Sequence, residues 1–267
     1  FNLVKDRHDA WCNVLRNLPA GRTAIYHHRI HRRIHDRLTD ASEPEFSAAF
    51  SKAYQDRISV APMMSNELYI TLLYRPFPSE LAKRSVRASR TKESLTDYQN
   101  QTLATMEQQG ALIERSLREF GPTLLGCYEQ DGNLFWESGE LFSFLINGVW
   151  RKVRFPTGPA YQALPDARLT FGGGMLEIRQ GERRRYASML SIKEFAGQVE
   201  PGTLGALLYE DSEFIETQSF SSLPRRQAMA ALTTQRDQLL ASDDAVVTQI
   251  EAMDVALDQL GDGQFVM

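Results

Sequence analysis

Residues 23–35 read TAIYHHRIHRRIH and contain four of the five histidines of the chain. The β-branched and aromatic residues at 23–26 follow a turn-forming Pro-Ala-Gly sequence at 19–21, which favours a strand over a helix. Along a strand, the even positions are largely apolar, and the odd positions from 27 onward are all histidine or arginine. In a helix Tyr26, Ile30 and Ile34 would still share a face, so periodicity alone does not decide. The stretch therefore predicts a strand with one wholly basic side.

The spacing of His27, His31 and His35 raises the question of a metal site. In a strand, His27 and His35 would lie about 26 Å apart at roughly 3.3 Å per residue, which is too far for one metal ion. In a helix, His27 and His31 could share a zinc ion, but no nearby cysteine or obvious carboxylate completes the ligand set. We therefore expect no metal here. A phosphate-contacting basic stripe remains an alternative to the favoured interpretation, a strand edge that faces solvent or a partner.

Hydrophobic periodicity predicts interleaved helices and strands outside this stretch. Helices are expected at 5–17, 44–58, 93–120, 139–147, 202–209, 224–241 and 242–260. Strands are expected at 67–76, 150–155, 167–171, 175–179, 185–192 and 213–220, with a hairpin at 123–135 around Asp131-Gly132. Because tight turns join many neighbouring strands, the sequence predicts an α+β fold: mostly antiparallel sheets with flanking helices and two closing C-terminal helices. A proline-rich stretch at 155–167 indicates a weak internal boundary.

The composition, 42% apolar and 24% charged, is typical of a globular protein. No apolar run approaches the roughly 18–20 residues that a membrane-spanning helix needs. Cys12 and Cys127, which have apolar sequence neighbours, are interpreted as buried thiols of a reducing compartment, because a disulfide framework would need more cysteines in a shorter chain. The start at Phe1 and the strand-like end lead us to expect a piece of a longer protein.

The net charge of −4 conceals a polarity along the chain. Residues 22–37 and 83–92 are strongly basic, whereas the chain beyond Arg236 has seven acidic residues and no lysine or arginine. Such an asymmetry concerns partners rather than fold.

No catalytic constellation is visible. Gly172-Gly173-Gly174 runs into the strand-like sequence MLEI rather than into a helix, so we interpret it as a hairpin turn and not as a phosphate-binding loop. The sequence contains no GxxxxGK[ST], HExxH, GxSxG or CxxC motif. A third hypothesis, that the chain is an unrecognised enzyme, has no candidate nucleophile or base in the sequence to support it.

Several stretches carry a resemblance when they are taken together and in order. They are Tyr26–Ile30, Asn66–Pro76, Leu124–Trp150, Leu164–Arg179, Ser188–Phe195, Pro201–Leu208, Phe214–Ala228 and Asp243–Met267. In this order they resemble the VirB/TrbE/CagE family, the large cytoplasmic ATPases of bacterial type IV secretion and conjugation machines. Each stretch alone is typical of a fold and not of catalysis.

The resemblance implies that residues 1–267 are the N-terminal docking and assembly domain of such an ATPase. The motor domain, which is RecA-like and holds ATP and Mg²⁺, is expected beyond residue 267, so no catalytic, cofactor-binding or metal-binding residue is assigned to this chain. The family works at the cytoplasmic face of the inner membrane of Gram-negative bacteria and energises transfer of DNA or protein across the envelope. Implied partners are other copies, as dimers or hexamers, inner-membrane subunits and the membrane surface.

The charge polarity suggests which residues make these contacts. The candidate partner-contact residues are Arg29, Arg33, Arg84, Arg87, Asp254 and Asp258. We expect charge-assisted assembly that weakens as salt rises, and the alternative is a solvated acidic helix without a partner. The alternative function is a stand-alone nucleic-acid-binding protein that uses 22–37 and 83–92. Nucleic-acid binding is not expected, because aromatic residues do not interleave with these stretches at a stacking period and the net charge is negative.

Overall fold

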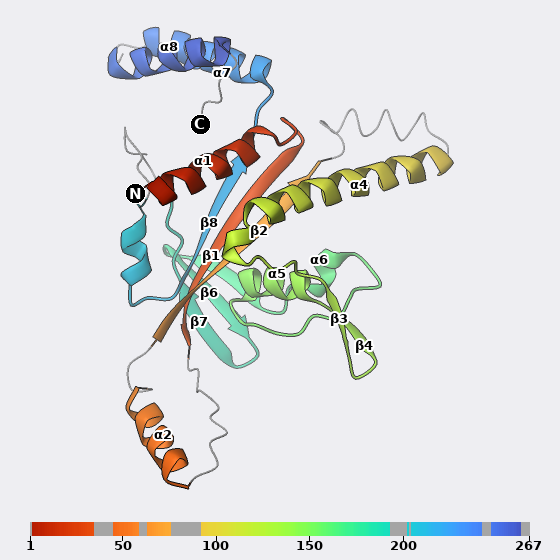
Figure 1. The fold of residues 1–267 in the computed structure, drawn as a ribbon, viewed down its shortest axis with the longest axis vertical. Coiled ribbons are helices and arrows are strands. Elements are labelled where there is room, and N and C mark those ends of the chain that lie inside the picture. Colours follow the sequence, from red (N-terminus) through yellow and green to blue (C-terminus); the bar gives the residue numbers. More distant parts are fainter. Residues whose placement is uncertain are drawn as a thin grey trace. The chain divides into compact units, whose positions relative to one another are not determined.

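A computed structural model describes residues 2–34, 45–58, 63–75, 92–192, 202, 204–241 and 247–262 (Figure 1). The helices are α1 (Asn2–Arg16), α2 (Glu45–Ile58), α4 (Lys92–Ser116), α5 (Glu137–Asn147), α6 (Ala160–Ala163), α7 (Arg225–Leu240) and α8 (Val247–Gly261). The short 3₁₀ helices are η1 (Arg118–Phe120) and η2 (Gly205–Tyr209). None of the described helices is long and apolar enough to span a membrane.

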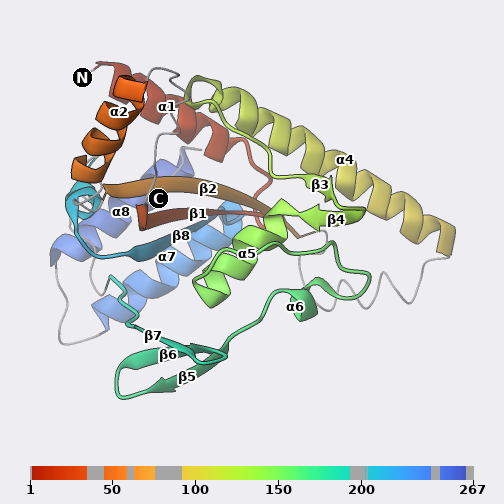
Figure 2. The same ribbon diagram turned by 90° about the horizontal axis from the view of Figure 1, so that it is seen from below.

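The strands form three sheets. One has the order β2-β1-β8, with β1 (Thr23–Ile34) between β2 (Met63–Tyr74) and β8 (Phe214–Ser221). The second is the hairpin of β3 (Cys127–Gln130) and β4 (Asn133–Trp136). The third is an antiparallel meander of β5 (Arg168–Gly172), β6 (Met175–Gln180) and β7 (Arg183–Ala187), which is seen edge-on in Figure 2. The predicted α+β class is confirmed.

The chain divides into two compact units. Unit 1 comprises Phe1–Ile30, Ser65–Pro122 and Glu216–Met267, and unit 2 comprises His31–Met64 and Thr123–Ile215. Residues 155–167, where the sequence suggested a weak boundary, lie inside unit 2.

The apolar core of unit 1 joins α1 and α4 to the sheet. Its buried members are Val14, Leu15 and Leu18 at the end of α1, Ile25 on β1 and Ile113 on α4. Both ribbon views show α1 and α4 on the same face of the β2-β1-β8 sheet (Figures 1 and 2). The helix expected at 5–17 is confirmed as α1, and its apolar residues Val14 and Leu15 are buried because this face meets both α4 and the sheet.

Turn chemistry fixes the elements of unit 2 where the sequence predicted it. Asp131 and Gly132 both have positive φ, 51° and 71°, as a two-residue hairpin between β3 and β4 requires. Gly148 adopts the left-handed conformation and its N–H donates to Phe144 O, which ends α5. The triple glycine joins β5 to β6 in a hairpin, as expected.

Several local predictions were wrong. The strand expected at 185–192 is β7, which ends at Ala187. Cys12 is buried as expected, but Cys127, which was also expected to be buried, is exposed.

Residues 150–155 were expected as a strand, but only an isolated bridge between Arg154 and Phe135 forms there. The segment pairs with β4 at this single position. Trp136 N donates to Val153 O, and Phe155 N donates to Leu134 O. The helix expected at 202–209 is the 3₁₀ turn η2.

Candidate partner-contact site

The basic strand β1 is the central strand of its sheet and not an exposed edge. His28, Arg29, Ile30 and His31 are all at most 8% exposed. Successive residues of a strand point to opposite faces, so this continuous burial means that both faces are covered there. The interpretation of the stretch as a solvent-facing or partner-facing edge was therefore wrong. Periodicity could not reveal this, because the odd positions are basic whether or not the sheet has a neighbour on each side.

Strand β8 supplies the partners of the basic residues that belong to unit 1. Arg29 forms an ion pair with Glu216, and both side chains are largely buried, at 9% and 16% exposure. His28 Nδ1 lies 2.9 Å from Thr217 Oγ1. Burial lowers the pKa of both His27 and His28 below the ordinary histidine value. Both rings are therefore neutral at pH 7, and their stretch is less cationic than the sequence suggests.

The partners in unit 2 come from the residues that lead into β8. His31 Nε2 lies 2.7 Å from Glu210 O, so that nitrogen carries the proton and donates. Arg33 is exposed, and its Nη2 donates to Asp211 O over 3.1 Å. No group of three potential metal ligands gathers within the described parts of the chain, and His35 lies outside those parts.

The acidic candidates lie on α8, which packs against α7. Asp254 forms an ion pair with Arg236, with 3.2 Å between Asp254 Oδ1 and Arg236 Nε, and its side chain is 52% exposed. Asp258 is exposed one helical turn further on. Within α8, Leu260 is buried, whereas Val247 at the start of the helix is 66% exposed.

The structure thus separates the six candidates by their surroundings. Arg29 is buried against Glu216 and does not contribute to an exposed basic surface. Arg33, Asp254 and Asp258 remain exposed. Arg84 and Arg87 lie outside the described residues.

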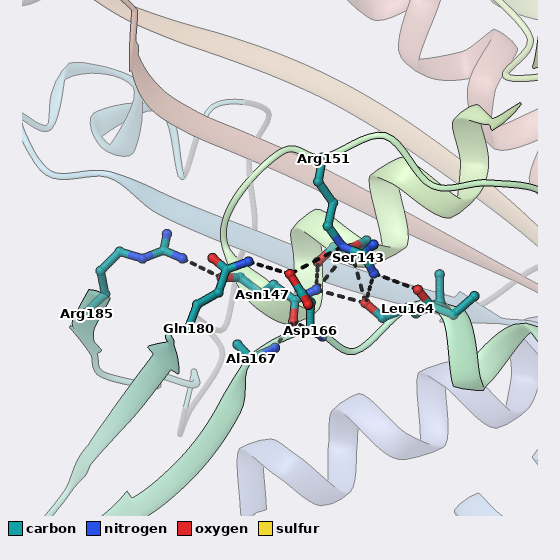
Figure 3. A network of polar contacts seen from close by, with 9 residues as sticks. Ser143, Asn147, Arg151, Leu164, Asp166, Ala167, Gln180 and Arg185 are labelled. Carbon is teal, nitrogen blue, oxygen red and sulfur yellow. Dashed lines mark hydrogen bonds and ion pairs between the residues drawn. The ribbon is translucent and has the colours of Figure 1, made fainter. Parts of the chain in front are cut away.

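A buried polar network in unit 2 was missed by the sequence analysis (Figure 3). At its centre Asn147, the last residue of α5, is fully buried. Its Nδ2 donates to Ser143 O at 2.8 Å and to Leu164 O at 2.9 Å. Its Oδ1 accepts from the backbone N–H groups of Asp166 and Ala167, both at 2.9 Å. One side chain therefore ties the segment before β5 to the end of α5.

Two arginines complete this network. Arg151 donates from Nε to Ser143 Oγ at 2.9 Å and from Nη2 to Ala163 O at 2.6 Å. Arg185, on β7, donates to Asn147 O at 2.7 Å and to Gly148 O at 2.5 Å. These are the free carbonyls at the end of α5, where a cation is favoured by the helix dipole.

A second polar contact holds the β3–β4 hairpin to α5. The hydroxyl of Tyr128 donates to Glu140 Oε1 over 2.7 Å. This hydrogen bond raises the pKa of Tyr128 to about 12, so the phenol stays a donor at neutral pH. Together these contacts hold the β3–β4 hairpin and the segment before β5 to α5.

Comparison with known proteins decides the family. Residues 3–82 match the family described as "Type IV secretion system ATPase VirB4/TrbE, N-terminal domain". Residues 123–267, more than half of the chain, match the family described as "CagE, TrbE, VirB family, component of type IV transporter system". The chain belongs to this CagE/TrbE/VirB family. The resemblance inferred from the sequence is thereby confirmed.

Similar proteins of the family carry the same type of name. The chain is 36% identical over 275 residues to the type IV secretion system protein PtlC of Bordetella pertussis, covering 99% of this chain and 33% of that protein. It is 35% identical over 269 residues to the type IV secretion system protein virB4 of Brucella abortus, covering 98% and 32%. The virB4 protein of Bartonella quintana is 27% identical over 270 residues. The chain therefore spans about a third of the length of the relatives that it matches.

Proposed function

We propose that this chain is the N-terminal assembly and docking domain of a type IV secretion ATPase that energises transfer of DNA or protein across the cell envelope. The observation that carries the proposal is the match of residues 3–82 to the N-terminal domain of the VirB4/TrbE ATPases. The chain also lacks a phosphate-binding motif, so ATP and Mg²⁺ would be held by another part of the protein.

The surfaces of the chain support a role in assembly. Its described acids on α8 are exposed, and no lysine or arginine follows Arg236 in the sequence. In this proposal the domain contacts neighbouring copies and inner-membrane subunits at the cytoplasmic face of the inner membrane of a Gram-negative bacterium. The membrane surface itself is a further contact.

The alternative of nucleic-acid binding through 22–37 is not favoured. His28, Arg29 and His31 are buried there and bonded within the chain, so they cannot reach a phosphate backbone. The part of this alternative that depends on 83–92 lies outside the described residues.

The test compares the full-length ATPase with a version that lacks this domain. Cell fractionation followed by affinity capture of the tagged ATPase measures its recovery with inner membranes and with an untagged second copy. We expect the truncated protein to lose both while the remaining chain still binds ATP. Equal recovery of the two proteins would refute the proposal.

A further inference from the structure

The meander β5–β6–β7 presents one open face. Residues that are directly opposite each other on neighbouring antiparallel strands point to the same face of a sheet. Arg185 belongs to the face that bonds to the end of α5. The other face carries Thr170, Tyr186 and Arg179, all of which are exposed.

Three arginines lie in register across this open face. Arg168 of β5 is opposite Arg179 of β6, and Arg179 is opposite Arg184 of β7. We call these three residues the arginine row. All three are exposed, and Arg184 has one acidic neighbour, Glu177, at 3.9 Å. The side chains of Arg168 and Arg179 form no hydrogen bond or ion pair with any residue that the structure describes.

Like charges directly opposite each other destabilise a sheet. Here two successive strand pairs place arginine against arginine, and one carboxylate at 3.9 Å does not neutralise three cations. The repulsion among the three arginines falls when a binding partner brings several negative charges to the arginine row. The binding group should therefore be a line of acids about 10 Å long, since two strand spacings of about 4.8 Å separate the outer arginines.

Helix α8 of the same chain carries such a line. Glu251, Asp254 and Asp258 are spaced i, i+3 and i+7, so they lie on one side of the helix, and all three are exposed. We call them the acidic face. At about 1.5 Å rise per residue they lie at about 0, 4.5 and 10.5 Å along the axis. The arginine row has its members at about 0, 4.8 and 9.6 Å.

We propose that the arginine row of one copy binds the acidic face of α8 of a second copy, with the helix axis lying across the three strands. This inference rests on the proposed role in assembly and names a surface for it. Asp254 shares its charge with Arg236, so Glu251 and Asp258 contribute more to the contact. The contact is a rim of exposed charges, which affects salt dependence and association rate more than it adds affinity.

A nucleic-acid strand fits the open face less well. Glu177 stands in the middle of the next row, between Thr170 and Tyr186, and would repel a phosphate backbone that ran along β6. Exposed Tyr186 could stack on a base, so the experiment includes a nucleic-acid measurement.

The test measures self-association of this chain by sedimentation velocity at about 50 and 500 mM NaCl, where the screening length falls by roughly threefold. The variants are Arg179→Glu, Asp254→Lys and the two combined, because Arg179 is the middle residue of the arginine row and Asp254 is the middle residue of the acidic face. The matched control is Arg183→Glu, which makes the same charge change at an exposed position of β7 on the opposite face.

We expect each single variant to raise the dissociation constant roughly tenfold at low salt and by less than about threefold at high salt. The combined variant should return to within about threefold of the unchanged chain, because its two substitutions exchange the charges and so restore attraction across copies. The control variant should behave as the unchanged chain.

Three outcomes would overturn the inference, and they differ in what else they affect. If Arg179→Glu leaves self-association unchanged, or the combined variant is no better than the single ones, the inference fails and the role in assembly stands. If Arg179→Glu abolishes binding of a fluorescent single-stranded oligonucleotide but not self-association, the arginine row binds nucleic acid instead. If the unchanged chain stays monomeric at both salt concentrations, the inference fails together with self-assembly of this domain.

Discussion

Replacing Asn147 by alanine should destabilise unit 2 more than any single change on its surface. The side chain is fully buried, and its Oδ1 accepts from the N–H groups of Asp166 and Ala167. Alanine leaves both donors without their acceptor. The carbonyl of Leu164 loses less, because Ser143 Oγ and Arg151 Nη2 still donate to it.

The expected loss of stability follows from the two N–H donors that are left without an acceptor. Each unsatisfied buried N–H costs about 1–3 kcal/mol, and partial access of water at this edge brings the sum to about 3 kcal/mol. For a protein of this size, that corresponds to a decrease in Tm of about 6–12 °C. Urea denaturation followed by circular dichroism measures the free energy of unfolding, and amide hydrogen exchange at 166 and 167 reports the local effect.

The chain offers a matched control in Asn133. Its Nδ2 donates one exposed hydrogen bond to Asp131 O at 3.0 Å, so Asn133→Ala should cost less than about 0.5 kcal/mol. If the two alanine variants unfold at the same urea concentration and exchange at 166 and 167 stays slow, the network does not hold unit 2 together as described.

Four further results are expected. Glu216→Gln should lower the free energy of unfolding by about 3 kcal/mol in urea denaturation, because it leaves a buried arginine uncompensated; a loss below about 1 kcal/mol would contradict the buried pair. The lowered pKa values of His27 and His28 mean that the unfolded chain takes up protons first, so stability should be full above about pH 6.5 and fall as pH drops below it; replacing both by glutamine should flatten this dependence in denaturation at about pH 7.5 and 5.5. Gly139→Ala should destabilise by about 2 kcal/mol and change the tryptophan fluorescence, since a Cβ there would lie 2.4 Å from the ring of Trp136; an unchanged spectrum and stability would rule out this close approach. Calorimetric titration of this chain with ATP should show no binding, and a micromolar dissociation constant would reveal a site that the motif search missed.

Short stretches of the sequence determine much of the local structure of this protein. The Asp-Gly turn between β3 and β4, the glycine end of α5 and the apolar spacing that buries α1 are decided by a few neighbouring residues. The backbone conformations that these residues favour are the same in any fold. The family, likewise, was indicated by the order of short stretches along the chain and confirmed by comparison.

Tertiary structure alone decided which charges are buried. The basic positions of β1 give the same pattern at an edge or in the centre of a sheet, and only the neighbours β2 and β8 make Arg29 and His31 interior residues. The arginine row was invisible for the same reason, because Arg168, Arg179 and Arg184 become adjacent only through the register of three strands. Asn147 meets Asp166 and Ala167 across a loop of about twenty residues. Sequence periodicity records which residues share a face of one element, whereas the partners of a charge are set by how separate elements pack.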